Sequence, residues 1–132
     1  MASTHANKAL SEVRSICLEL PEVSEKLSHG APSFFIRDKK MFVMFHDNHH
    51  GDEILGIWCA APPGVQQDLV ESEPDRFYRP AYVGHRGWLG VRLDVTPDWD
   101  ELRAILIDAY LQVAPATLAK KFLDSVNPNG KD

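Results

Sequence analysis

The stretch FYRPAYVGHRGWLGVRLD, residues 77–94, decides the fold, because it holds a strand and the turn that leads into it. Gly84, Gly87 and Gly90 are spaced through it and permit positive φ angles or close backbone approach at a tight turn. The turn VGHRGW then leads into a strand over residues 88–93. The two-residue period of a strand gives it an aliphatic face and a mixed face. These faces are made respectively of Leu89, Val91 and Leu93, and of Trp88, Gly90 and Arg92. The aliphatic face belongs to the core, and the mixed face is either open or covered by an element that tolerates a guanidinium.

The same stretch concentrates positive charge. No carboxylate interrupts the sequence between Asp75 and Asp94, and the arginines in that interval are Arg76, Arg79, Arg86 and Arg92. The whole chain nevertheless has a formal net charge of −5. Strong non-specific binding to nucleic acid depends on phosphate neutralisation by Lys and Arg, so the overall charge argues against it. One basic face remains compatible with this composition.

Length and composition indicate one domain spanning residues 1–132. A chain of this size buries roughly two thirds of its unfolded surface, enough for a core without metal or disulfide. Cys17 and Cys59 are far apart, lie in apolar stretches and lack C-x-x-C spacing, which indicates two buried reduced thiols. We find neither an apolar leader nor a run of about 18 apolar residues, and expect a cytoplasmic protein with no membrane partner. We also expect a monomer without a cofactor.

The first half of the chain changes from a helical to a strand period. Apolar residues recur at helical spacing over residues 8–20, and Pro21 ends this helix. Residues 23–30 are typical of a short edge strand or a loop. Three antiparallel strands follow over residues 33–59. Their two connections, which could project from the sheet as wings, are Arg37–Lys40 and His46–Asp52.

The second half adds three predicted helices. A short one opens at Pro63 or Gly64 and runs to about residue 72. Thr96 is the predicted N-cap of a longer helix that has Pro97 at its first position and runs to about residue 113. A last helix starts at Pro115, and residues 127–132 should fray. The apolar residues expected to face inward are Trp99, Leu102, Ile105, Leu106, Ala109, Tyr110 and Val113, and then Leu118, Phe122 and Val126. The pattern as a whole indicates an α+β fold.

Two groups of histidines suggest enzyme alternatives. The segment from His46 to Glu53 includes His49 and His50, whose imidazoles could converge with carboxylates on a divalent ion. The spacing matches no closed zinc site, and its residues suit a turn. His85 could act in acid/base catalysis beside a nucleophile or carboxylate, but no known catalytic signature is present. We predict no metal site and no catalytic residue. A metal-dependent or small-molecule enzyme centred on His85 or His49/His50 stays open.

Binding is the leading hypothesis for the basic stretch. Arginine guanidinium groups suit phosphates and guanine edges, and aromatic rings suit stacking. The candidate residues are Arg37, Lys39, Lys40, Arg79, Tyr82, His85, Arg86, Trp88 and Arg92, with Tyr78 as a further aromatic contact. The alternative is a solvated rim in which Tyr82 and Trp88 simply pack beneath the turn.

Several ordered segments carry a family resemblance. They are LPE (20–22), HG (29–30), PSF (32–34), the basic stretch 77–94, DWDEL (98–102) and DAYLQVAPATLA (108–119). Over these segments, nearly the whole chain, the sequence closely resembles the MmcQ/YjbR-like family of small bacterial proteins. The resemblance implies a CyaY-like fold, similar to bacterial frataxin, with helices packed on one face of an antiparallel sheet. It also implies DNA binding of the double-wing kind.

Under this resemblance the wings would be the turns at 37–40 and 83–88, with an open sheet face between them. The iron binding of frataxins is not carried over, because the first helix offers only Glu12, Glu19 and Glu22, with Arg14 among them. We therefore expect a small non-enzymatic module. It would bind DNA, weakly and with salt dependence, or a protein partner through the same face.

Overall fold

Antiparallel pairing builds a six-stranded sheet in the computed structural model, which describes residues 4–47 and 54–126. The strands are β1 (Val23–Ser28), β2 (Ala31–Ile36), β3 (Lys40–Asp47), β4 (Leu55–Cys59), β5 (Phe77–Tyr78) and β6 (Leu89–Arg92). Their order in the sheet is β1-β2-β3-β4-β6-β5. The segment after the first helix is thus an edge strand. The other edge, β5, was not predicted, because two residues are too few to show a strand period.

Short turns join the first three strands, with two residues between β1 and β2 and three between β2 and β3. His29 and Gly30 have φ angles of 51° and 82°, and Arg37 and Asp38 have φ angles of 54° and 58°. Paired positive φ angles are what type I′ hairpin turns require, and their twist matches that of the flanking strands. The Lys39 N–H donates to the Ile36 carbonyl at 3.0 Å and closes the second turn. The predicted connection at 37–40 is therefore confirmed as a tight hairpin.

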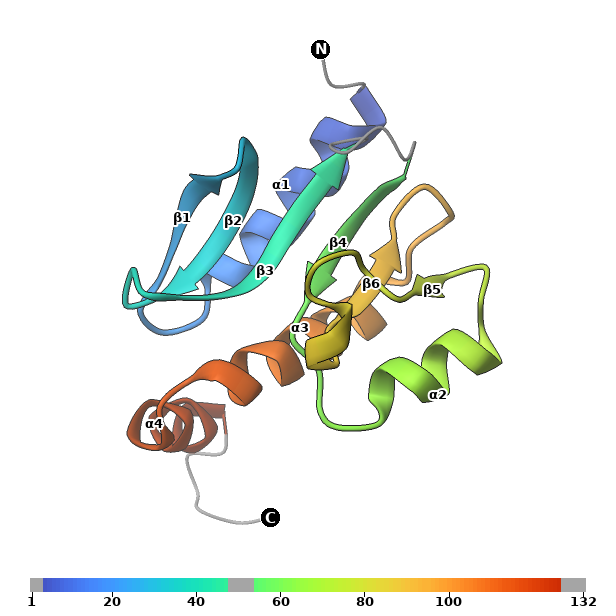
Figure 1. The fold of residues 1–132 in the computed structure, drawn as a ribbon. Coiled ribbons are helices and arrows are strands. Elements are labelled where there is room, and N and C mark those ends of the chain that lie inside the picture. The colour runs from blue at the N-terminus through green and yellow to red at the C-terminus, as the bar shows by residue number, and fades with distance from the viewer. Residues whose placement is uncertain (1–3, 48–53, 127–132) are drawn as a thin grey trace.

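Two helices cover one face of the sheet (Figure 1). These are α1 (Thr4–Leu18) and α3 (Trp99–Val113). The short helix α2 (Val65–Ser72) packs against β5 and β6, and α4 (Ala116–Val126) follows α3. The expected α+β class, an antiparallel sheet with helices on one face, is confirmed. Among the described residues, no helix has the length and apolar character needed to cross a membrane.

The core lies between the sheet and these two helices. Val43, Cys59 and Leu89 align across β3, β4 and β6, and all three are fully buried. From α3, Tyr110 packs edge-on against Phe42 with 5.7 Å between ring centroids, and its hydroxyl donates to the Pro21 carbonyl at 2.8 Å. The predicted aliphatic face of β6 is confirmed, because Leu89, Val91 and Leu93 are all buried.

Two details of the predicted helices are wrong. The N-cap of α3 is Asp98 and not Thr96: one Asp98 carboxylate oxygen accepts from the N–H groups of Asp100 and Glu101 at 3.1 and 3.2 Å. Pro97 therefore precedes the cap. In α4, Val126 is 62% exposed, because this last helical residue lies beyond the buried pair Leu118 and Phe122.

Candidate functional site

The face of the sheet opposite α1 and α3 carries a row of residues that includes two aromatic side chains. Met44, Trp58, Gly90 and Tyr78 align in register across β3, β4, β6 and β5. A Cβ atom on Gly90 would lie 2.5 Å from the Tyr78 ring, so the ring rests directly on this glycine. From there the Tyr78 hydroxyl accepts a hydrogen bond from the Trp58 indole N–H at 3.2 Å. Gly90 thus has the close approach expected of it, and it lets an edge-strand ring reach the middle of the sheet.

Trp58 lies at the centre of this aromatic group. The His46 ring stacks on it with centroids 3.8 Å apart and a tilt of 32°. The Tyr82 ring approaches from the following loop, 6.3 Å away between centroids. Trp58 and His46 are buried, whereas Tyr82 is 75% exposed. The open face therefore has a buried aromatic floor, and one exposed aromatic side chain, Tyr82, lies at its rim.

The loop of residues 79–87, which we call the arginine loop, folds onto this face. Gln66 of α2 donates from its side-chain amide to the carbonyls of Gly84 and Trp88, at 2.9 and 2.5 Å. Gly84–Arg86 form a single 3₁₀ turn, which Gly87 ends with a φ angle of 82°. Figure 1 shows the loop crossing in front of β4. The expected wing at 83–88 is therefore a turn anchored on the sheet, because Gln66 and the burial of Gly84 hold it there.

A cavity of about 480 Å³ opens between the arginine loop and the strands β1 to β4. We call it the open-face cavity, and its lining residues are Ser28, His29, Met41, Met44, Trp58, Tyr82 and Val83. Two of them, His29 and Tyr82, have left-handed backbone conformations with φ angles of 51° and 65°. Such conformations cost non-glycine residues of the order of 1 kcal/mol, and they cluster at functional sites.

Most arginines of the chain are neutralised by a carboxylate. Five of the seven form ion pairs: Arg14 with Glu25, Arg37 with Glu22, Arg76 with Glu73 and Glu101, Arg92 with Asp94, and Arg103 with Glu19. The remaining two are Arg79 and Arg86, which form no ion pair within residues 4–47 and 54–126. Both lie on the arginine loop and both are exposed. The uncompensated guanidinium charge is thus concentrated beside the open-face cavity.

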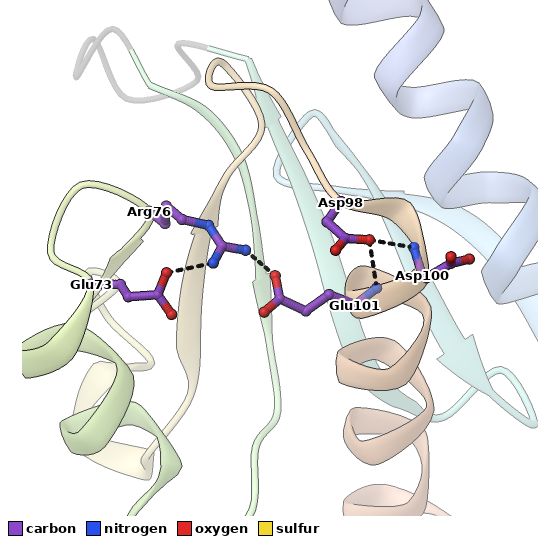
Figure 2. A network of polar contacts seen from close by, with 5 residues as sticks. All are labelled: Glu73, Arg76, Asp98, Asp100 and Glu101. Atoms are coloured by element: carbon purple, nitrogen blue, oxygen red, sulfur yellow. Dashed lines mark hydrogen bonds and ion pairs between the residues drawn. The ribbon is translucent and has the colours of Figure 1, made fainter.

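Arg76 shows how much the predicted basic patch shrinks in the folded chain. Its guanidinium donates to Glu73 at the end of α2 and to Glu101 in the first turn of α3 (Figure 2). These carboxylates raise the pKa of Arg76, and the hydrogen bond that Arg76 donates to Glu101 is the largest cause. Figure 2 also shows that Glu101 donates its backbone N–H to the Asp98 cap. Arg76 therefore links α2 to α3, and its charge is not available to a ligand of the arginine loop.

The predicted binding residues fall into three groups: the exposed residues of the arginine loop, Trp88 and Arg92 of the strand predicted over residues 88–93, and the turn at 37–40. Arg79, Tyr82, His85 and Arg86 are exposed together on the arginine loop. Trp88, a candidate contact residue, is only 4% exposed beneath the Arg86 guanidinium, which lies 5.1 Å from its ring centroid. Of the two arrangements that the sequence left open for Trp88, the structure has the one in which it packs beneath the turn. Arg92 donates to Asp94 through two hydrogen bonds of 3.0 and 2.7 Å.

The turn at 37–40 forms the third group and lies elsewhere. Arg37, Lys39 and Lys40 line a smaller cavity with Val113 and Pro115, at the corner between α3 and α4. Figure 1 shows this turn well away from the arginine loop. Arg37 is also paired with Glu22, which lowers the pKa of that carboxyl. The two expected wings therefore do not form one continuous basic surface.

The cavity lining includes residues that the sequence pattern did not single out. Met41, Met44 and Trp58 lie in the strands predicted over residues 33–59, and none of them was named as a candidate site residue. Between Phe34 and Phe35 the register of β2 with β3 shifts by one residue. This bulge places Met41 and Met44, three residues apart, on the same cavity, which a simple two-residue period does not predict.

Among the described residues, the structure adds no hydrogen-bonding partner to His85 and no metal-ligating group to the enzyme alternatives. No hydrogen bond or ion pair joins His85 to another described residue. No group of three or more His, Cys, Asp and Glu side chains in residues 4–47 and 54–126 could hold a metal ion. His49 and His50 lie outside the described residues. The described part of the chain thus offers an exposed loop and a cavity.

Comparison with known proteins places this arrangement in a family. A sequence model of the YjbR family matches residues 18–112, which hold all six strands of the sheet, the arginine loop and most of α3. The chain belongs to the YjbR family. The crystal structure of the Deinococcus radiodurans protein DR2400, which has a DUF419 domain, is similar to this YjbR domain with a TM-score of 0.68 and 20% sequence identity. The similarity covers 89% of this chain and 87% of the other, and shows a shared fold. No curated protein matches.

Proposed function

We propose that this YjbR domain is a non-enzymatic module that binds DNA through the arginine loop and the open face beside it. The observation that carries the proposal is that Arg79 and Arg86, alone among the seven arginines, have no carboxylate partner in the described part of the chain. A guanidinium offers a planar fork of donors that matches phosphate oxygens. His85 and Tyr82 extend the same exposed surface.

The small number of uncompensated cations sets the expected strength of binding. The net charge of −5 opposes association with a polyanion, and only two arginines are available on the loop. Neutralising two phosphates gives a slope of about −1.8 for log K against log salt, so affinity should fall about tenfold between about 50 and 200 mM salt. We therefore expect weak binding that depends on salt.

Fluorescence anisotropy of a labelled oligonucleotide at these two salt concentrations tests the proposal. Arg79→Glu and Arg86→Glu should each weaken binding and flatten the salt slope by about 1. Arg103→Glu makes the same charge change on α3, where Arg103 pairs with Glu19 behind the sheet, and is the matched control. If all three substitutions weaken binding equally, the effect is one of net charge and the loop is not the site. If the unmodified domain does not bind at about 50 mM salt, DNA is not its ligand.

A protein partner on the same face is the second candidate. It is favoured by the exposed Tyr82 ring, which lies beside an apolar cavity. Aromatic side chains of this kind anchor protein interfaces. Binding of that type would change little with salt, and Tyr82→Ala would weaken it more than Arg86→Glu.

A further inference from the structure

The open-face cavity has the size and lining of a ligand site. Its volume of about 480 Å³ falls within the range of roughly 300–1,000 Å³ that is typical of small-molecule pockets. Met41, Met44 and Val83 make it largely apolar, and Trp58 forms part of its floor. Thioether groups also make favourable contacts with aromatic rings. A flat ring system matches this lining well.

The rim of the cavity has polar side chains and two residues with strained backbone conformations. His29 and Ser28, at the end of the β1–β2 hairpin, bring an imidazole and a hydroxyl that can both donate and accept hydrogen bonds. On the other side, Tyr82 presents a ring that is 75% exposed. His29 and Tyr82 both have positive φ angles, although glycine would take these conformations more easily. Both residues therefore hold their side chains at the cavity from backbone conformations that carry a local cost.

Charge distinguishes a nucleobase from other flat ligands. Tyr82 and Val83 line the cavity and belong to the arginine loop. Arg79 and Arg86 are in the same loop, so the cavity and these two guanidinium groups are adjacent parts of one surface. A nucleotide has both parts that this surface would contact, a ring for the cavity and a phosphate for a guanidinium. An aromatic side chain of a protein has the ring alone and would leave the arginines unused.

We infer that the open-face cavity accepts one unpaired base of a single-stranded nucleic acid, stacked against Tyr82, while Arg79 and Arg86 bind the adjoining phosphates. This inference rests on the proposed function and deepens it. A paired base is held inside the duplex and cannot enter a cavity on a protein surface. The domain therefore distinguishes a single strand from a duplex.

A single-stranded oligonucleotide with 2-aminopurine at its centre tests the inference against the duplex of the same sequence. Stacking on Tyr82 should quench the 2-aminopurine fluorescence, and the single strand should bind about tenfold more tightly or better, the scale of one base–aromatic stack. Ser28→Phe, which fills the cavity, should remove the quenching and this preference. Leu27→Phe adds the same ring at the next position of β1, which is 73% exposed and does not line the cavity, and should change neither. Should Ser28→Phe fail to fold, Tyr82→Gly removes the stacking ring at an exposed position.

The outcomes separate this inference from the proposed function. Equal affinity for single strand and duplex, lost in Arg86→Glu and unchanged in Ser28→Phe, overturns the base site and leaves DNA binding intact. If neither nucleic acid binds, the proposed function fails, and the cavity is then tested with a deoxynucleoside monophosphate alone. Methionine-methyl NMR signals of Met41 and Met44 that do not shift with that probe overturn the base site as well. Shifts with N-acetyl-tyrosinamide and none with the nucleotide overturn it in favour of a protein side chain.

Discussion

Tyr82 combines a strained backbone with an exposed side chain. Its φ angle of 65° is in the left-handed region, and its ring is 75% exposed. Replacement by Gly relieves the backbone, whereas replacement by Ala removes the same ring and keeps the strain. We expect the Gly variant to exceed the Ala variant by about 1 kcal/mol in free energy of unfolding. Urea unfolding of the two variants measures this difference. An Ala variant that is equally stable would show that the loop relaxes and that Tyr82 is not strained.

At the same scale, single residues explain where sequence reasoning about the site failed. The sequence shows that Arg76, Arg79, Arg86 and Arg92 are close together in the chain, and cannot show which of them meet carboxylates. Arg76 contacts Glu101, which is 25 residues away. Such a pairing depends on how α3 returns to the sheet. The exposed half of the predicted site, on the arginine loop, needed only local information.

Among the elements, α3 depends on its cap. Both hydrogen bonds at its N-terminus are accepted by the Asp98 carboxylate, at 3.1 and 3.2 Å. Asp98→Ala should lower the free energy of unfolding by about 1 kcal/mol, the usual value of an N-cap. Thr96→Ala should change it by less than about 0.5 kcal/mol, as for a surface substitution. Thermal or urea unfolding checks both, and a larger loss for Thr96→Ala would restore the cap that the sequence suggested.

Most elements were predictable because their periods are long enough to recognise. The helices α2, α3 and α4 and the strands β2, β3, β4 and β6 all appear close to the predicted positions. The two edge strands were harder to predict. β1 alternates weakly because it is partly exposed along its length, and β5 has two residues. The open-face cavity could not be predicted, since it depends on the bulge in β2 and β3 and on the fold of the arginine loop.

For the whole molecule, the two cysteines report on the integrity of the core. Burial raises the pKa of the Cys59 thiol from 9.0 to about 12, and burial also raises the pKa of Cys17, with the neighbouring Cys59 and Glu25 as smaller causes. Both thiols should resist Ellman's reagent at pH 8 until the chain unfolds. Rapid reaction of the folded protein would contradict the predicted burial.

The same pKa values fix the direction of an effect of pH on stability. In the unfolded chain the thiols lose their protons near pH 9, whereas the folded chain keeps them protonated to a higher pH. Between these values the unfolded state binds fewer protons, so stability falls as pH rises, by up to about 1.4 kcal/mol per pH unit for each thiol. Below pH 9 the thiols should have no effect. Urea unfolding at pH 8 and pH 10 measures the slope, and the double variant Cys17→Ala/Cys59→Ala should reduce it.

The measurement that tests the account most directly is an NMR titration of the ¹⁵N-labelled domain with a single-stranded oligonucleotide at low salt. We predict that the amide signals that shift will belong to the arginine loop and to residues around the open-face cavity, such as His29, Met44 and Trp58. Signals from α1, α3 and the turn at 37–40 should stay in place. Shifts confined to those helices or to that turn, or no shifts at all, would contradict the account.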